Sequence, residues 1–131
     1  MLNTKTVLLV EDDVDDQDFF IHVLDEIKNV KLFGVVRNGR EALERLRKAT
    51  ILPSIIFMDV NMPVMNGIEC LEEMAKDPSV NSIPVVMLSS SVHLRDRARF
   101  LGATAFIEKP NSSESLRHSL EQLIQRNLVT A

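Results

Sequence analysis

Cysteine is scarce in this chain, and long apolar runs are missing altogether. Cys70 is the only cysteine, which excludes an intrachain disulfide framework and fits a reducing compartment. No apolar run approaches the roughly 20 residues that a membrane-spanning helix needs. The first residues do not have the shape of a signal peptide. We therefore expect a cytoplasmic protein that does not bind membranes.

A large excess of charge of one sign is also missing. The chain has 15 lysines and arginines against 19 aspartates and glutamates, a formal net charge of −4. This balance argues against non-specific binding to nucleic acid or to an anionic membrane. Two basic runs, residues 45–48 and 95–99, are typical of solvated helix faces rather than of phosphate-contacting patches.

What the chain does have is a regular alternation of two kinds of segment over 131 residues, a length that suits one domain. Short apolar runs predict strands at residues 6–10, 31–36, 54–58, 84–88 and 103–108. Apolar residues at helical spacing predict helices at residues 13–28, 38–49, 67–76, 91–101 and 112–128. Such alternation predicts a parallel sheet with helices on both faces. We expect a single α/β domain over residues 1–131, a flavodoxin-like (βα)5 three-layer sandwich with strand order 2-1-3-4-5.

Residues suited to the ends of helices stand at the predicted boundaries. Asn38 can cap the second helix, and Ser112 or Ser113 can cap the fifth. Gly102 follows the fourth predicted helix, as a glycine that ends a helix does. In the long loop after the third strand, we expect Gly67 to adopt a positive φ.

Carboxylates gather at the ends of two predicted strands. Glu11, Asp12 and Asp13 follow the first strand directly, and Asp59 follows the third. In an open α/β sheet with the expected order, these two strand ends flank the point where ligands bind. Neighbouring carboxylates repel one another, and a hard divalent cation such as Mg²⁺ or Mn²⁺ relieves that repulsion. The pattern therefore predicts a metal site with one carboxylate free to act as a nucleophile.

Two further polar residues close neighbouring strands at the same rim. Ser89 follows the fourth strand, and Lys109 follows the fifth. A carboxylate beside Mg²⁺ can attack a phosphoryl group and form an aspartyl phosphate. Lys109 and the metal would offset charge on the phosphoryl oxygens, and the Ser89 hydroxyl could bond one of them.

Each of these residues also has an ordinary structural explanation. Asp13 starts the first helix and fits an N-cap better than a metal ligand. Glu11 could cap or face solvent, and Asp59 could be a simple turn residue. Ser89 could belong to a plain loop, and Lys109 could lie on the surface. Their joint placement at one rim favours the functional explanation.

Taken together, these segments resemble the receiver domain of two-component response regulators. The resemblance covers nearly the whole chain, and the order and spacing of its motifs are highly specific. It is carried by residues 10–13, 58–67 and 84–90, and by residues 102–103 with 108–110.

The resemblance implies roles for the acidic residues. Asp59 would be the phospho-acceptor, taking its phosphoryl group from a phosphohistidine on a sensor histidine kinase or a phosphotransfer protein. Asp12 would bind Mg²⁺ (or Mn²⁺) directly and Glu11 would bind it through water. Asn61 would give its backbone carbonyl to the metal.

The resemblance also implies a two-state switch. Ser89 and Lys109 would move toward the phosphorylated aspartate, and Phe106, in the place of the switch aromatic, would turn inward. The face made by the fourth helix, fifth strand and fifth helix would then change its preference for a downstream protein, and it could also form a homodimer. The family often has a cis bond before the proline that follows the lysine, and the sequence leaves open whether Lys109-Pro110 is cis.

The end of the chain and a few departures refine this picture. Only residues 129–131 follow the fifth predicted helix, so we expect no output domain and no enzyme activity beyond self-modification. The resemblance is closest to stand-alone CheY-like regulators and to those paired with phytochrome-type kinases. Phe106 lacks the hydroxyl of the commoner tyrosine, and Asn111 replaces a usual apolar residue. Asn61 and Ser91 stand at positions that tune phosphoryl lifetime in this family.

Three alternatives stay open from the sequence. One is a degenerate receiver that binds partners without phosphorylation, although the complete acid set with Ser89 and Lys109 weighs against it. Another is a Mg²⁺-dependent aspartyl-phosphate hydrolase, which usually needs a second acid where this chain has Asn61. The last is a flavodoxin-like cofactor binder. Its phosphate loop after the first strand should be rich in Ser, Thr and Gly, whereas residues 11–13 are acidic and would repel a phosphate.

Overall fold

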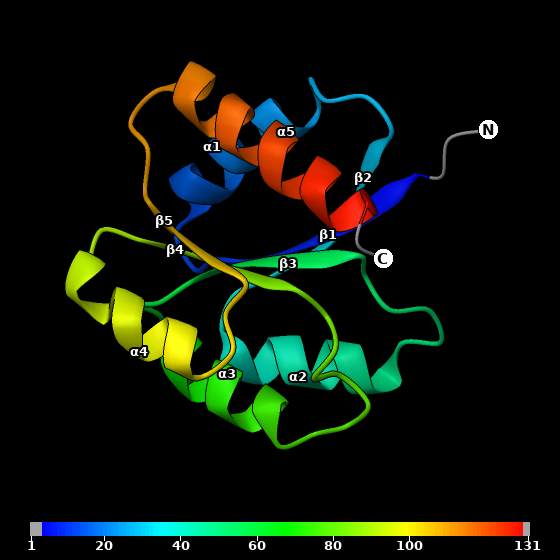
Figure 1. Ribbon diagram of the computed structural model, residues 1–131, viewed down its shortest axis with the longest axis vertical. Helices are drawn as coiled ribbons and strands as arrows, with labels where there is room; N and C mark the ends of the chain where they lie inside the picture. The colour runs from blue at the N-terminus through cyan, green and yellow to red at the C-terminus, as the bar shows by residue number, and fades with distance from the viewer. Residues whose placement is uncertain (1–3, 130–131) are drawn as a thin grey trace.

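The computed structural model describes residues 4–129, which form one twisted parallel sheet between two layers of helices (Figure 1). The strand order is β2-β1-β3-β4-β5, and every neighbouring pair is parallel. The predicted fold class and strand order are therefore confirmed. The strands are β1 (Lys5–Val10), β2 (Val30–Val36), β3 (Ile55–Asp59), β4 (Val85–Ser89) and β5 (Ala105–Glu108).

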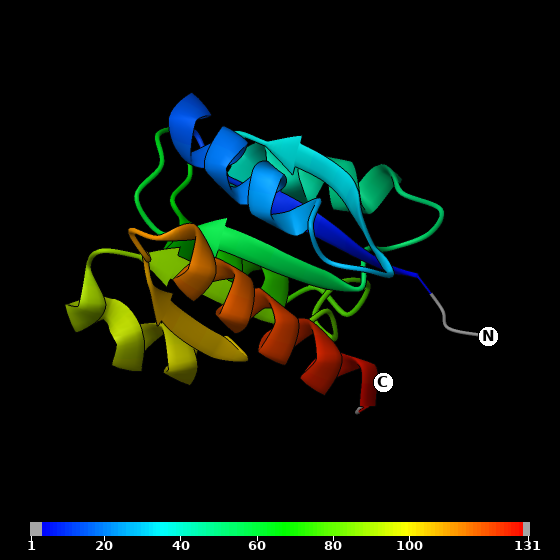
Figure 2. The same cartoon turned by 90° about the horizontal axis from the view of Figure 1, so that it is seen from above.

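The helices divide between the two faces of the sheet. Helices α1 and α5 lie side by side on one face, and α2, α3 and α4 cover the other (Figures 1 and 2). This arrangement places the connections between strands and helices at the two ends of the sheet. The helices are α1 (Val14–Leu24), α2 (Gly39–Lys48), α3 (Gly67–Ala75), α4 (Arg95–Phe100) and α5 (Ser113–Val129), with a 3₁₀ turn, η1 (Val92–Leu94), before α4.

The sheet is buried on both faces, which explains the continuous apolar runs in the sequence. In β1, Val7 and Leu9 pack under α1 and α5, whereas Leu8 and Val10 pack under α2 and α3. All residues of β3 and β4 are buried. Because a parallel strand in this position has no solvated side, polar residues are confined to its ends.

The predicted helix caps are confirmed. The Asn38 side chain accepts a hydrogen bond from the Glu41 N–H (3.0 Å), and the Ser112 hydroxyl accepts one from Ser115 (3.2 Å). Asp13 caps α1 by accepting from two backbone N–H groups of its first turn. These bonds satisfy amide groups that a helix leaves unpaired at its start, and so they fix where each helix begins.

Two helices are shorter than the sequence predicts. Helix α1 ends at Leu24 instead of residue 28, because the Glu26 and Ile27 N–H groups bond to carbonyls three residues back instead of four. The chain then turns at Asn29, whose φ is 63°, and enters β2. Helix α4 covers Arg95–Phe100 instead of residues 91–101. Neither Ser91 nor Leu94 makes a side-chain cap bond, so nothing stabilises an earlier start and η1 forms there instead.

The prediction that Gly67, in the loop after β3, adopts a positive φ is wrong. Gly67 does not have a positive φ, whereas Val64 in the same loop has a φ of 69°. Gly67 is needed because a Cβ there would run into the backbone carbonyl oxygen of Asp59. Gly102 does adopt the left-handed conformation expected at a helix end, with a φ of 107°.

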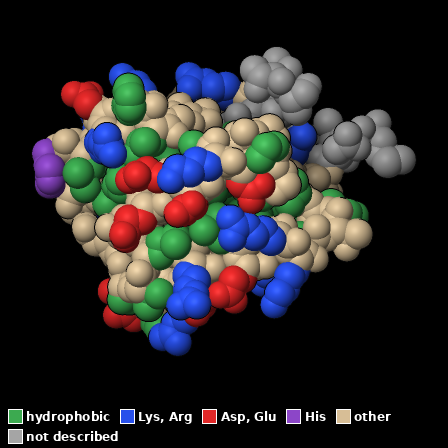
Figure 3. Space-filling view, turned by 90° about the horizontal axis from the view of Figure 1, so that it is seen from below, with side chains coloured by type: hydrophobic (Ala, Val, Ile, Leu, Met, Phe, Trp, Pro, Cys, Tyr) green, Lys and Arg blue, Asp and Glu red, His purple; other side chains and the backbone are tan. Residues whose placement is uncertain are grey.

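Charges of both signs are interspersed on the face of the molecule shown in Figure 3. Ion pairs on α2 and between α3 and α4 match this mixture, for example Arg40 with Glu44 and Arg97 with Glu72. No extended basic field covers this face. Within residues 4–129, no helix combines the length and the apolar character that crossing a membrane requires.

Candidate functional site

Three carboxylates converge where β1 and β3 end. Val10 pairs with Met58 in neighbouring strands, so the residues that follow emerge at the same edge of the sheet. One oxygen each from Glu11, Asp12 and Asp59 lies within 4.8 Å of the others. Glu11 and Asp59 are only 3% and 5% exposed, so their charges are mostly removed from water. The structure thus brings together three residues that the sequence predicts at one rim.

The Lys109 ammonium lies among these carboxylates. Its Nζ atom is 2.9 Å from Glu11 Oε1, 2.8 Å from Asp16 Oδ2 and 3.5 Å from Asp59 Oδ2. The backbone holds the base of this side chain, because the Lys109 N–H donates to the carbonyl of Ser89 at the end of β4 (3.1 Å). A single cation is therefore shared by three acidic groups.

Burial shifts the ionisation of the two enclosed acids. It raises the pKa of Glu11 from 4.5 to about 7, with the charge of Asp59 adding to the rise and the hydrogen bond from Lys109 opposing it. Burial also raises the pKa of Asp59 above its ordinary value, against the charge of Lys109 and hydrogen bonds from the Val60 and Asn61 N–H groups. Excess negative charge at this rim is therefore costly unless a cation joins it.

The pKa of Lys109 moves the other way. Burial alone would lower it, but hydrogen bonds to Asp16 and Glu11 and the charge of Asp59 together hold it above its ordinary value. The lysine therefore stays charged throughout the physiological range, and it can offer a positive group to an incoming anion.

Ser89 is fully buried beside the acids, and its hydroxyl is already engaged. The hydroxyl oxygen accepts a hydrogen bond from the Ser91 N–H (2.9 Å). Across the mouth of the site, the Asn61 side-chain amide donates to the Ser91 hydroxyl (3.3 Å). The loops after β3 and β4 are thus joined by side chains at the positions that the resemblance connects with phosphoryl lifetime.

Phe106 stands farther along the sheet, in β5. It pairs with Met87 of β4, is partly buried, and packs against the core on the face of the sheet that α2, α3 and α4 cover. The Arg95 guanidinium of α4 lies 5.6 Å from the centre of its ring. A change in the position of the Phe106 ring would therefore alter its contact with α4.

The structure decides the isomer of the Lys109-Pro110 bond. The structure contains no cis peptide bond among residues 4–129, so this bond is trans. The sequence leaves the isomer open because an X-Pro bond prefers trans by only about 0.5–1 kcal/mol. Glu108 is exposed and makes no ion pair with Lys109, whose acidic partners are Glu11, Asp16 and Asp59.

Two residues of α1 contribute to the site and were missed from the sequence. Asp16 binds Lys109, and the Gln17 side-chain amide donates to the backbone carbonyl of Glu11 (2.7 Å). Both lie in the first turns of a helix, where polar residues are usual, so no pattern marks them. Only the packing of α1 against the end of β1 brings them to the rim.

The donor set fits a hard divalent cation. Glu11, Asp12 and Asp59 supply carboxylate oxygens at one point. The Asn61 backbone lies at the same rim, because its N–H bonds to the Asp59 carboxylate. Cysteine and histidine, which softer metals prefer, are absent from this group.

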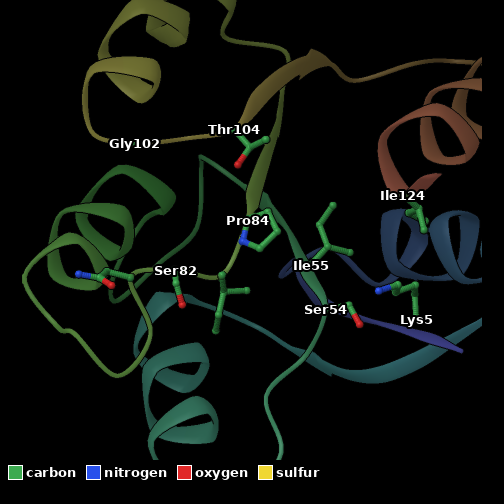
Figure 4. Close-up of a pocket in the computed structure, with 10 residues that line it drawn as sticks. Lys5, Ser54, Ile55, Ser82, Pro84, Gly102, Thr104 and Ile124 are labelled. Carbon is green, nitrogen blue, oxygen red and sulfur yellow. The ribbon is translucent and has the colours of Figure 1, made fainter. Parts of the chain in front are cut away.

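A cavity at the opposite end of the sheet has a different character. It measures about 420 Å³ and is lined at the starts of the strands by residues such as Lys5, Ser54, Pro84 and Thr104 (Figure 4). None of its lining residues is acidic. Ligands of open α/β sheets bind beyond the carboxyl ends of the strands, so the acidic rim remains the stronger candidate.

Comparison with known sequences connects this geometry to a family. A sequence model described as the response regulator receiver domain matches residues 7–121. The match includes all of β2 to β5, most of β1 and the whole acidic rim. The chain belongs to this family. Receiver domains of this kind are phosphorylated by histidine kinases, and the resemblance seen in the sequence is thereby confirmed.

Solved receiver structures have the same fold over almost their whole length. The phosphorylated cyanobacterial phytochrome response regulator RcpA superposes with a TM-score of 0.85 at 29% identity, covering 98% of this chain and 96% of its own. The chemotaxis regulator CheY4 of Vibrio cholerae gives 0.78 at 29% identity, covering 92% and 98%. The Mn²⁺-bound form of Rcp1 gives 0.78 at 26% identity, covering 91% of each chain. The expected likeness to CheY-like and phytochrome regulators is confirmed.

The similar curated proteins are longer. A protein-glutamate methylesterase/protein-glutamine glutaminase of Geobacillus kaustophilus (strain HTA426) is 36% identical over 119 residues, which are 88% of this chain but 33% of that protein. The receiver domain thus spans about a third of the length of the curated relatives it matches. Receiver domains therefore also occur within enzymes.

Proposed function

We propose that this receiver accepts a phosphoryl group on Asp59 in a Mg²⁺-dependent reaction. The donor is a phosphohistidine on a sensor histidine kinase or on a histidine phosphotransfer protein. The observation that carries the proposal is the position of Asp59, a buried carboxylate 3.5 Å from the Lys109 ammonium and grouped with Glu11 and Asp12. Such a carboxylate is close to the charges that a phosphoryl group requires.

The transfer is an in-line displacement at phosphorus. An oxygen of Asp59 forms a bond to phosphorus while the P–N bond to the imidazole breaks. The imidazole nitrogen keeps the electron pair and takes a proton from solvent. Backbone N–H groups of Val60 and Asn61 orient the Asp59 carboxylate, and Lys109 offsets the negative charge of the phosphoryl oxygens.

Mg²⁺ or Mn²⁺ would be held by Glu11, Asp12, Asp59 and the Asn61 carbonyl. When bound, the ion neutralises the carboxylates and polarises the phosphoryl oxygens. The Mn²⁺-bound form of Rcp1 supports this assignment as a structural relative. The raised pKa values of Glu11 and Asp59 support it too, because burial removes both carboxylates from the water that would stabilise their negative charge.

The phosphorylated state would act as a binding signal. Ser89 would leave its bond with Ser91 to reach a phosphoryl oxygen, and Phe106 would turn inward. The surface formed by α4, β5 and α5 would then select a downstream protein or a second copy of the chain. We propose that the protein works as a stand-alone regulator in the cytoplasm and catalyses only its own phosphorylation and dephosphorylation.

The test is modification by a small phosphoryl donor. Incubation with phosphoramidate and Mg²⁺ should add one phosphoryl group to the intact mass of the wild-type protein. Asp59→Asn should abolish this addition, whereas Asp18→Asn, which removes an exposed carboxylate from α1, should leave it unchanged. Mg²⁺-dependent modification of the Asp59→Asn protein at the wild-type rate would refute the proposal. Phosphotransfer from the host's histidine kinases, measured in parallel, would then identify the donor.

A further inference from the structure

One carboxylate binds the Lys109 ammonium without belonging to the metal-holding group. Asp16 Oδ2 lies 2.8 Å from Nζ, whereas Asp59 Oδ2 lies 3.5 Å away. Glu11 Oε1, at 2.9 Å, is the other close partner. The acidic group that could hold a cation contains Glu11 and Asp59 but not Asp16. Asp16 therefore has a contact with the lysine and no evident share in metal binding.

The position of Asp16 is fixed by the way α1 joins β1. The Asp13 side chain caps the helix by accepting from the Asp15 and Asp16 N–H groups (2.8 and 3.2 Å). One residue later, the Gln17 amide donates to the Glu11 carbonyl and ties the helix to the strand end. The first turn of α1 is thereby held against the acidic rim, within hydrogen-bond distance of Lys109.

Packing does not confine the lysine side chain to this place. A hollow of about 320 Å³ borders Lys109 and Asp16, with apolar walls from α1 and α5 that include Phe19, Phe20 and Leu116. The Lys109 side chain is 24% exposed. Because space remains around it, the direction of the ammonium is set by its ion pairs rather than by steric contact.

We infer that Asp16 is a positioning residue that holds the Lys109 ammonium in the unphosphorylated protein and competes for it with the phosphoryl group. The inference rests on the proposed function of Asp59. Phosphorylation adds negative charge at Asp59, and the lysine gains a stronger partner there. The Asp16 side chain is 47% exposed, so its pair with Lys109 is weakened by water and can be released.

The test compares Asp16→Asn with Asp15→Asn. Both variants lose one carboxylate from the first turn of α1, but Asp15 is exposed and forms no ion pair with Lys109. The measured quantity is the dissociation constant of beryllofluoride, a non-covalent phosphoryl analogue, in saturating Mg²⁺ by calorimetry. Asp16→Asn should bind the analogue about two- to fivefold more tightly than wild type, the range expected for an exposed pair. Asp15→Asn should bind within about twofold of wild type on the same scale.

A third variant separates positioning from a merely structural role. Asp16→Glu keeps the carboxylate and should restore binding toward the wild-type value. A structural role would make Asp16→Asn bind the analogue more weakly and unfold more easily, and that result overturns the inference. Equal affinities for Asp16→Asn and Asp15→Asn overturn it too. If the wild-type protein neither binds beryllofluoride nor gains a phosphoryl group, the proposed function fails first and the inference with it.

Discussion

At the scale of single residues, the acidic rim combines enclosed negative charge with one shared cation. Glu11 and Asp59 are nearly excluded from water, and both have raised pKa values. The charge of Lys109 and the hydrogen bonds to these carboxylates offset part of the free-energy cost of burying them. Glu11 therefore makes the stability of the protein depend on pH.

Without divalent metal, stability should fall as pH rises through the titration of Glu11. Its folded pKa of about 7 lies above the ordinary value of 4.5, so the folded state holds the proton more tightly than the unfolded chain. The stabilising contribution is full below about pH 4.5 and is lost as pH approaches 7. We expect the free energy of unfolding in urea with EDTA to drop by about 1–3 kcal/mol across this interval.

Two measurements check this assignment. Glu11→Gln cannot ionise, so its unfolding free energy should change less over the same interval. Saturating Mg²⁺ should flatten or reverse the trend in the wild-type protein, because the metal binds the deprotonated carboxylates. A wild-type protein whose stability rises from pH 5 to pH 7 in EDTA by more than about 1 kcal/mol would contradict the sign.

The backbone at Val64 is strained. Its φ of 69° lies in the left-handed region, which β-branched residues rarely adopt, and its side chain is 72% exposed. Val64→Gly should raise the free energy of unfolding by about 1 kcal/mol, measured by urea denaturation. Val64→Ala is the control, because it removes the apolar surface but keeps a Cβ. A glycine variant less stable than the alanine variant would show that strain is not the dominant effect.

At the scale of elements, the junction between β3 and α3 leaves no room for a side chain. Gly67 starts α3 against the end of β3, and an added Cβ would lie 2.7 Å from Met87 Cε and 3.0 Å from Val60 Cα. The Asn66 side chain and Glu69 form a capping box at the same point. The acceptor strand and the helix therefore have to approach each other without a side chain between them.

Two glycine substitutions separate crowding from backbone strain. Gly67→Ala should destabilise the protein by about 2 kcal/mol or more, because the Cβ meets backbone atoms that cannot give way. Gly102→Ala should cost only about 1 kcal/mol, because its surroundings are open within 4 Å and the penalty comes from its φ of 107°. Thermal unfolding of both variants tests this order. The opposite order would show that the loop before α3 can shift.

At the scale of the whole molecule, the acidic rim connects to a distant face through β4 and β5. Ser89 ends β4, Phe106 of β5 pairs with Met87 of β4, and Arg95 of α4 lies over the Phe106 ring. Helix α4 is short, and no side-chain bond caps its start. Such an element is stabilised by few local interactions, and it can respond to a change in the strands beneath it.

Saturating beryllofluoride with Mg²⁺ should therefore shift backbone amide resonances at the rim and along α4 and β5. Phe106→Ala should keep the shifts near Asp59 and lose most of those in α4, because the contact with Arg95 is removed. Amide spectra of both proteins, with and without the analogue, provide the measurement. Helix α2, which lies away from Phe106, is the internal reference. Full α4 shifts in the variant would mean that another contact transmits the change.

The sequence by itself determined the fold class, the strand order and most members of the acidic rim. Apolar runs and helical spacing are local patterns, and the carboxyl ends of parallel strands meet at one edge whatever the loops do. For this reason Glu11, Asp12, Asp59, Ser89 and Lys109 could be placed together before any coordinates. The end of α1 and the start of α4 were not predicted correctly, because no strong capping residue marks these helix boundaries in the sequence.

The tertiary structure alone decided three other features. The pairing of Asp16 with Lys109 depends on residues 93 positions apart meeting in space, and no sequence pattern encodes that distance. The trans bond before Pro110 and the left-handed Val64 depend on small conformational energies that surrounding contacts outweigh. Local chemistry selects which groups reach the end of a strand, and packing decides which of them touch.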